Sequence, residues 1–294
     1  MQALLYYSIY PFMWLISLLP FSLLYAISDV LAVLVYYVFP YRKKVVLANL
    51  THAFPEKTKK EILSMARLFY IHFCDVLMET IKTLSISEKE LTSRVRFINM
   101  DIFDTLYKKN RSVVVAMGHY GNWEWYNLAG KYIPHKAFTI YKPLTNMYYD
   151  RLMKRVRGRF GILPIPMGTI YQTLVRCREA GILTATGFIA DQAMQRKDIQ
   201  YWTTFLHQET PVLLGLERIA KKTHAAVAFF TMRKIRRGYY EVTCEKLFDD
   251  PSLTADYEIT EAHVRKLEQL IREHPQYWLW THRRWKHKRN PNNA

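Results

Sequence analysis

The feature of this chain that most limits its fold is a repeated alternation of short apolar runs and amphipathic helical patterns. Apolar runs of four to eight residues that alternate with helices are typical of βα units. The predicted strands are residues 112–117, 137–141, 162–165 and 181–189, and the helices that follow them are 122–131, 146–157, 169–179 and 211–222. This order predicts an α/β fold with a mixed, mainly parallel sheet flanked by helices.

Further elements are predicted on both sides of this alternation. Residues 225–232 and 239–246 read as an antiparallel strand pair joined by a basic turn, and a helix is predicted at 256–273. Upstream, a basic amphipathic helix covers 43–52, and a long helix begins at Thr58 and runs to about Thr83. Thr58 and Glu61 have the spacing of a capping box, which fixes the start of this helix.

The first 39 residues form an apolar segment in which Asp29 is the one charged residue. Residues 4–27 are apolar enough to span a bilayer, which requires about 20 residues. Pro11 and Pro20 interrupt this run. The segment therefore predicts membrane association, with a buried pair of core helices as the alternative.

A basic flank, Arg42-Lys43-Lys44, follows the apolar segment. Positive charge beside a membrane segment favours the cytoplasmic side. A cleavable signal peptide is disfavoured because a basic start and a small-residue cleavage site are missing. We therefore predict a membrane anchor at residues 1–40 and one folded domain at residues 41–294 on the cytoplasmic side of that membrane, against its inner leaflet.

The composition points to an anionic partner. Lys and Arg number 42 against 25 Asp and Glu, which gives a net charge of +17. No zinc-knuckle, RNA-recognition or helix-turn-helix signature is present, so a membrane is a better partner than nucleic acid. Cys74, Cys177 and Cys244 are widely spaced without a CxxC pair, and we expect buried free thiols rather than disulfides or a metal site.

A glycine-flanked histidine follows the strand predicted at 112–117, in the order Gly118-His119-Tyr120-Gly121. Parallel sheets place their sites at the carboxyl ends of strands. Glu124 falls in the first turn of the next predicted helix, from which its carboxylate can turn back toward His119. A carboxylate on one ring nitrogen makes the other a better base. We therefore predict that His119 and Glu124 are catalytic, with a structural histidine as the alternative. The helical HExxH spacing is absent, and no metal is expected.

Basic residues repeat along the helix predicted at 146–157. Arg151, Arg155 and Arg159 follow at intervals of four residues, and Lys142 lies at a nearby strand end. Like charges at this spacing repel one another unless an anion binds, and arginine suits phosphate. The stripe predicts an anion site, with a solvated helix face as the alternative. Asp191 also follows a strand, so it lies either near the site or against an arginine.

The C-terminal segment is rich in tryptophan and arginine. We expect Trp278 and Trp280 in the core, because tryptophan is usually well buried. Trp285 with Arg283 and Arg284 fits either a core plug or an aromatic and basic belt at a membrane interface.

The segment from Gly118 to Glu124 resembles the HX4(D/E) block of the bacterial lipid A late acyltransferases. The resemblance covers nearly the whole chain. Its other parts are residues 42–56, the Tyr141-Lys142-Pro143 and 150–157 segments, Asp191-Gln192, and residues 275–286. The chain departs from the family pattern at Met194-Gln195-Arg196 and Phe205-Leu206-His207, where the family has a glycine and an FFG-like turn.

The resemblance implies a glycerolipid-acyltransferase-like fold and transfer of a fatty acyl chain from acyl carrier protein to a hydroxyl of a Kdo-bearing lipid A precursor. His119 would be the base and Glu124 its partner. The acceptor would be bound by Lys142, Arg151, Arg155, Arg159 and Asp191. No cofactor beyond the acyl donor is implied.

Two other functions remain open from the sequence. The first is a lysophospholipid acyltransferase, which would share the His119 chemistry with a different acceptor. The second is a non-enzymatic membrane protein whose basic surface binds anionic lipid. That second function explains the charge and the apolar segment, but it does not require a histidine and a glutamate at a strand–helix junction.

Overall fold

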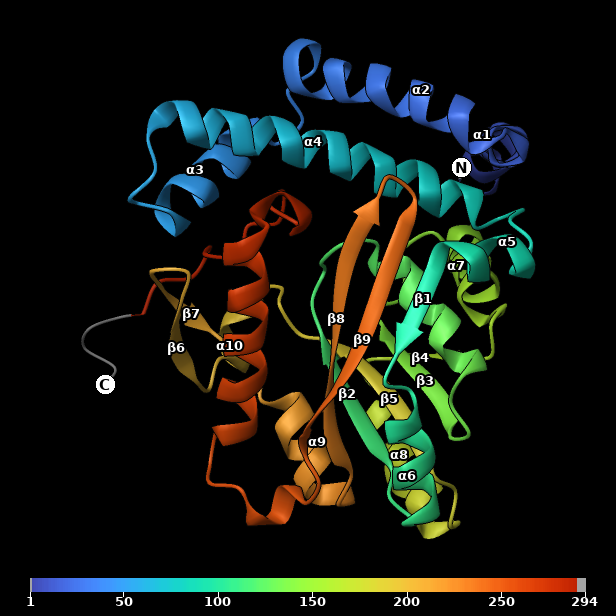
Figure 1. Cartoon of the computed structure of the whole chain (residues 1–294), viewed down its shortest axis with the longest axis vertical. Coiled ribbons are helices and arrows are strands. Elements are labelled where there is room, and N and C mark those ends of the chain that lie inside the picture. The colour runs from blue at the N-terminus through green and yellow to red at the C-terminus, as the bar shows by residue number, and fades with distance from the viewer. Residues whose placement is uncertain (1, 290–294) are drawn as a thin grey trace.

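A seven-stranded sheet forms the centre of the protein, whose structure here is a computed structural model that describes residues 2–289 (Figure 1). The strands run β1-β9-β8-β2-β5-β3-β4 across the sheet. Their bounds are β1 (Val95–Ile98), β2 (Val113–Met117), β3 (Lys136–Tyr141), β4 (Leu163–Pro166), β5 (Thr184–Ile189), β8 (Ala226–Arg236) and β9 (Tyr239–Phe248). Neighbouring strands pair in parallel except β8 and β9, which are antiparallel. The predicted mixed, mainly parallel sheet is confirmed.

Helices flank this sheet. They are α3 (Lys43–Ala53), α4 (Lys59–Lys82), α5 (Glu88–Arg94), α6 (Asp101–Lys108), α7 (Met147–Gly158), α8 (Ile170–Glu179), α9 (Gly215–Thr223) and α10 (Glu258–Glu273). The capping box at the start of α4 is confirmed, since Thr58 accepts from the Glu61 amide and Glu61 accepts from the Thr58 amide.

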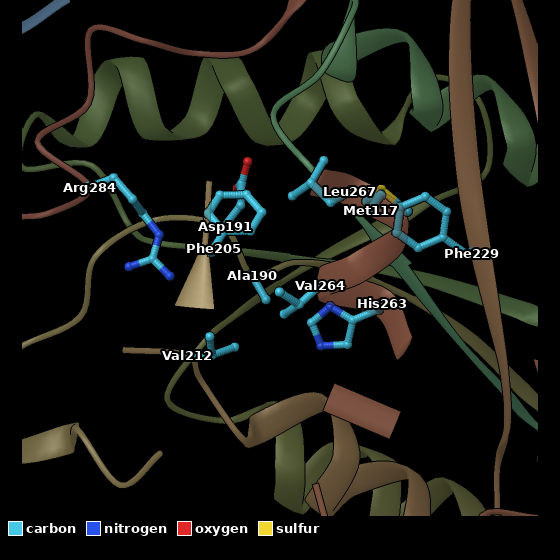
Figure 2. A pocket seen from close by; sticks show the side chains of 10 residues that line it. All are labelled: Met117, Ala190, Asp191, Phe205, Val212, Phe229, His263, Val264, Leu267 and Arg284. Atoms are coloured by element: carbon cyan, nitrogen blue, oxygen red, sulfur yellow. The ribbon is translucent and has the colours of Figure 1, made fainter. Parts of the chain in front are cut away.

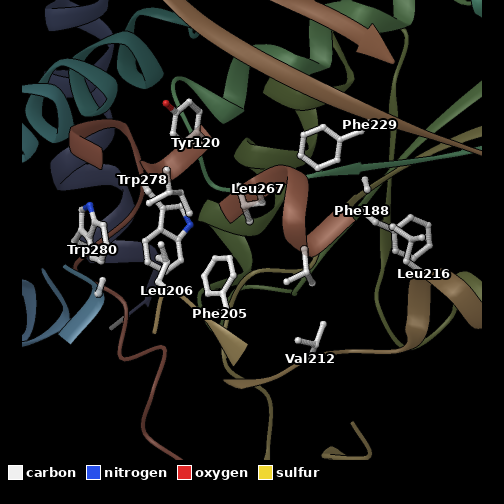
Figure 3. Packing of buried hydrophobic residues seen from close by; sticks show 14 of the residues in the cluster. Tyr120, Phe188, Phe205, Leu206, Val212, Leu216, Phe229, Leu267, Trp278 and Trp280 are labelled. Carbon is white, nitrogen blue, oxygen red and sulfur yellow. The ribbon is translucent and has the colours of Figure 1, made fainter. Parts of the chain in front are cut away.

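The central strand β2 is buried on both faces, as expected for a parallel strand covered by helices. Val113 and Val115 pack into the core on one face, and Val114 packs into the core on the other. Trp278 and Trp280 are 3% and 0% exposed and lie within the Val114 core, which confirms their predicted burial (Figure 3). The three cysteines are free and buried, also as predicted.

Several elements differ from the sequence-based expectation. The strand β1 and the helix α6 were not anticipated, because β1 has four residues and includes the charged Arg96. The chain also forms a separate hairpin of β6 (Trp202–Phe205) and β7 (Gln208–Pro211). The helix predicted from residue 211 therefore starts later, at Gly215.

The apolar N-terminal segment forms two helices. These are α1 (Gln2–Leu18) and α2 (Phe21–Val33), and a short π-helical turn, η1 (Leu34–Val38), continues α2. The predicted interruption at Pro20 is confirmed, because α1 ends before Pro20 and this proline precedes the first residue of α2. Pro11 lies inside α1 without ending it.

One helical stretch, Phe21–Val38, is long and apolar enough to cross a membrane by length and composition. Its mean hydropathy is 1.9, and 28% of it is buried within the protein, so most of its apolar surface has no protein partner. The inner side of α2 is polar in places and packs on α4, where Tyr25 donates to Glu79 and Ser28 donates to Asp75.

Candidate active site

His119 and Asp191 meet at the carboxyl ends of two adjacent parallel strands. Met117 at the end of β2 is in register with Ile189 at the end of β5. Each site residue comes two positions later, so the register brings the two side chains together. The Nδ1 atom of His119 lies 2.6 Å from Oδ1 of Asp191, and the His119 backbone amide donates to Oδ2 at 2.8 Å. Asp191, rather than Glu124, is therefore the partner of the imidazole.

The Asp191 carboxylate is buried and fully hydrogen-bonded. Its side chain is 4% exposed, and Trp278 Nε1 donates to Oδ2 at 2.8 Å. Burial alone raises the pKa of this carboxyl, but the charge of His119 and the hydrogen bonds from His119 and Trp278 outweigh burial and lower it to about 2. Asp191 is therefore ionised at neutral pH.

The ionised carboxylate fixes the tautomer of His119. Because Asp191 can only accept, Nδ1 carries the proton and Nε2 presents its lone pair. Gln192 Nε2 lies 3.2 Å from this atom and can donate to it. The His119 side chain is 19% exposed, so Nε2 can be reached from solvent. An imidazole held in this way can act as a general base toward a hydroxyl.

Two glycines let the chain make this turn. A side-chain carbon on Gly118 would lie 2.5 Å from a Leu267 methyl and 3.3 Å from Asp191 Oδ2. Gly121 has φ of +62°, in the left-handed region, where a side-chain carbon would also lie 2.8 Å from the Met232 sulfur. The Gly121 amide then donates to the carbonyl of Tyr277 at 3.0 Å, which ties the turn to the C-terminal segment.

Glu124 has a different partner from the one expected. Arg157 on α7 donates to it through two nitrogens, Nε to Oε2 at 3.0 Å and Nη2 to Oε1 at 2.6 Å. The expectation that its carboxylate turns back to the imidazole is wrong, since Asp191 already occupies Nδ1. The helix that carries Glu124 also differs from the predicted one. It is the 3-10 helix η2 (Trp123–Lys131), and the Asn122 side chain before it donates to Glu79 and does not cap η2. A catalytic role for Glu124 stays a prediction.

Replacing Glu124 with Ala is expected to lower the free energy of unfolding by about 1.5–3 kcal/mol, the contribution typical of a charged hydrogen-bonded pair. The pair is largely buried, with side chains 12% and 24% exposed, so the substitution leaves the Arg157 charge without its partner. Thermal unfolding measures the loss. Adding Arg157→Met should recover part of it, and equal stability of Glu124→Ala and wild type would contradict this account.

The three arginines of the predicted basic stripe, Arg151, Arg155 and Arg159, do not share the same surroundings. Arg151 and Arg155 are exposed on α7, and neither makes an ion pair within residues 2–289. Arg159, at the end of α7, instead donates to the carbonyls of Thr83 and Ile86 just beyond α4. This corrects the expectation for Arg159, whose guanidinium ties two segments together, whereas the other two arginines remain free for a ligand.

The free cations lie near the apolar N-terminal helices. Tyr6 of α1 stacks on Tyr148 of α7, with ring centroids 5.5 Å apart. Burial raises the pKa of the Tyr6 hydroxyl, and the nearby charge of Arg155 opposes that rise. Lys142 follows β3 and is also exposed, with no ion pair in the described part of the chain. These positions suit an anionic group at a membrane surface.

Sequence reasoning missed the roles of Trp278 and Gln192 at the site. Trp278 was expected in the core and is there, but its indole nitrogen also supports Asp191. Asp191 itself was left between two possibilities, and the structure places it at the histidine. Among residues 2–289 no group of three His, Cys, Asp or Glu side chains is arranged to hold a metal ion.

Comparison with known protein families gives a match over nearly the whole chain. The family model described as bacterial lipid A biosynthesis acyltransferase matches residues 2–287. The match includes the N-terminal helices, the His119–Asp191 pair and the C-terminal tryptophans. Comparison with curated proteins gave no match.

Proposed function

Because the chain belongs to the bacterial lipid A biosynthesis acyltransferase family, we propose that it transfers a fatty acyl chain from acyl carrier protein to a hydroxyl of a lipid A precursor. The observation that carries the proposal is the His119–Asp191 pair, in which Asp191 holds Nδ1 and Nε2 of the imidazole faces Gln192. Acyl transfer to a hydroxyl needs a base at the acceptor oxygen, and this pair provides one.

In the proposed reaction His119 Nε2 takes the proton of the acceptor hydroxyl as its oxygen attacks the carbonyl carbon of the acyl thioester. The carbon–sulfur bond then breaks, and the leaving thiolate receives the proton from His119. Asp191 stabilises the imidazolium while it exists. The acyl donor is the only other molecule that this chemistry requires.

The acceptor is proposed to bind through Lys142, Arg151 and Arg155, since a lipid A precursor carries two phosphates and the carboxylates of its Kdo sugars. Each charged hydrogen bond contributes about 1.5–3 kcal/mol, or roughly one to two powers of ten in affinity. Arg155→Ala is therefore expected to raise the Michaelis constant for the acceptor more than that for the donor. Lys108→Ala, an exposed lysine on α6, is the control. Equal effects of the two substitutions would contradict the assignment.

The test of the proposed function gives the purified protein two acceptors, a Kdo-lipid A precursor and a lysophospholipid, with one acyl carrier protein donor. Acylation of the lipid A precursor is expected. Acylation of the lysophospholipid alone would replace this proposal with a lysophospholipid acyltransferase. A second assay, with the same fatty acyl group carried by coenzyme A, would identify the preferred donor.

We further propose that α1 and α2 hold the protein on the cytoplasmic face of the inner membrane. Exposed apolar side chains cover both helices, among them Leu4, Phe12, Leu15, Val30 and Val33. Changing Leu4, Phe12 and Leu15 together to Ser should shift protein into the soluble fraction, because burying each such side chain contributes about 1.5–3 kcal/mol. The basic surface should retain part of it at low salt. Full recovery of the wild type in a high-salt soluble fraction would contradict the proposal.

A further inference from the structure

A small cavity of about 20 Å³ is lined in part by Asp191 (Figure 2). It has room for a single water molecule. Apolar side chains form much of its wall, and three polar side chains reach it: Asp191, His263 and Arg284. Asp191 therefore shares a mainly apolar cavity with a buried arginine and a buried histidine that the proposed reaction does not use.

Arg284 is the unusual member of this set. It is 3% exposed, and one of its nitrogens, Nη2, donates to the carbonyl of Pro211 at 2.6 Å. Its Nε and Nη1 atoms have no hydrogen-bond partner within residues 2–289. Burial lowers the pKa of Arg284 to about 10 while Asp191 opposes that change, so the side chain remains a cation at neutral pH. A buried charge with free N–H groups is costly unless a counter-charge lies nearby.

Asp191 is that counter-charge. Burial lowers the pKa of His263 to about 4, although Glu217, Glu261 and Asp191 oppose the shift, so His263 is neutral at pH 7. Its Nε2 atom also lacks a partner in the described chain. Asp191 is thus the one ionised acid on the cavity wall. Its two oxygens already accept from His119 and Trp278, so Arg284 acts on it across the cavity.

The other titratable neighbours of Asp191 are uncharged at neutral pH. Burial lowers the pKa of His282 to about 4, and its Nε2 accepts from the Ala193 amide at 2.9 Å. Tyr126 is buried, which raises the pKa of its hydroxyl well above the neutral range. His119 is left as the group that exchanges protons with the substrate. Arg284 is therefore the fixed positive charge beside the pair.

We propose that Arg284 is a positioning residue for the reaction: its buried charge faces the Asp191 carboxylate across the cavity and balances it, so that the carboxylate does less to hold a second proton on the His119 imidazole. Without this cation the negative charge of the carboxylate would be unbalanced, and it would favour the protonated form of the imidazole. The inference rests on the proposed acyl transfer and adds a residue that does not touch the substrate.

The test compares the dependence of kcat/KM on pH in the wild type and in Arg284→Lys and Arg284→Gln. Gln keeps a donor for the Pro211 carbonyl but has no charge. We expect the acid limb, which reports the His119–Asp191 pair as a unit, to move up by about one pH unit in Arg284→Gln, within the range typical of a nearby charge. In Arg284→Lys it should stay at the wild-type position.

The outcomes separate a positioning role from a structural one. Loss of thermal stability with an unmoved acid limb in Arg284→Gln would mean that Arg284 only supports the fold, and would overturn the proposal. If Arg284→Gln does not fold, Arg284→Met, which is also uncharged, takes its place: an acid limb that moves up relative to Arg284→Lys supports the proposal, and an acid limb at the same pH in both variants overturns it. If the wild type has no acyl transfer activity at all, the proposed function fails first, and nitrogen NMR of the imidazole in wild type and Arg284→Gln still reports whether the pair takes up its proton at a different pH.

Discussion

Replacing Asp191 with Asn is expected to lower turnover by about 10,000-fold, the loss seen when an orienting carboxylate becomes an amide. The two side chains have the same shape, and the amide oxygen can still accept from Trp278 and from the His119 backbone. Its NH2 group, however, can donate to Nδ1, which forces the proton of the imidazole onto Nε2. His119 then faces the acceptor hydroxyl as a donor and cannot act as a base.

The measurement is kcat for the purified variant, with thermal unfolding as the check on the fold. Asp198→Asn is the matched control, since Asp198 lies in the same loop after β5 and is exposed. The control should retain nearly full activity. If Asp191→Asn keeps more than about a tenth of the wild-type rate, Asp191 does not orient the base and Glu124 returns as the candidate partner.

Replacing His119 with Ala is expected to lower turnover by about 100- to 10,000-fold, the usual contribution of a general base. The fold should survive, because the side chain is partly exposed and its neighbours are the edge of Trp123, at 5.5 Å between ring centroids, and Gln192. Removing it does leave Asp191 with one bond fewer, so a modest loss of stability is expected.

The control is His207→Ala, because His207 is exposed on the β6–β7 hairpin away from the site. Retention of more than about a tenth of the wild-type rate by His119→Ala would exclude His119 as the base. A fall in activity that follows the fall in melting temperature across both variants would point to a structural role instead.

The position of His119 could be predicted from the sequence because its signals are local. An apolar strand, a glycine on each side and a helix start lie within a dozen residues, and the structure keeps that order. The carboxylate that pairs with His119 could not be predicted in the same way. The sequence places Glu124 five residues from His119 and Asp191 seventy-two residues away, and spacing alone favours the nearer carboxylate.

The strand order settles the partner. In the sequence, β3 and β4 come between β2 and β5. In the sheet, β5 pairs directly with β2, and β3 and β4 lie on the far side of β5. Hydrophobic pattern predicts each of these strands, but it does not say which strands are neighbours. The same reason explains why the contacts of Arg159 with the segment after α4 and of Arg157 with Glu124 were not predicted. Both are long-range and cannot be inferred from the helical spacing of α7.

Mass spectrometry of lipid A shows directly whether the His119–Asp191 pair acylates this lipid. Lipid A is isolated from cells that lack the protein and from the same cells carrying wild type, His119→Ala or Asp191→Asn at equal levels. The wild type should give a lipid A species heavier by one fatty acyl group, and this species should be absent with both variants. Identical lipid A in all four samples, or the heavier species with His119→Ala, would contradict the claim.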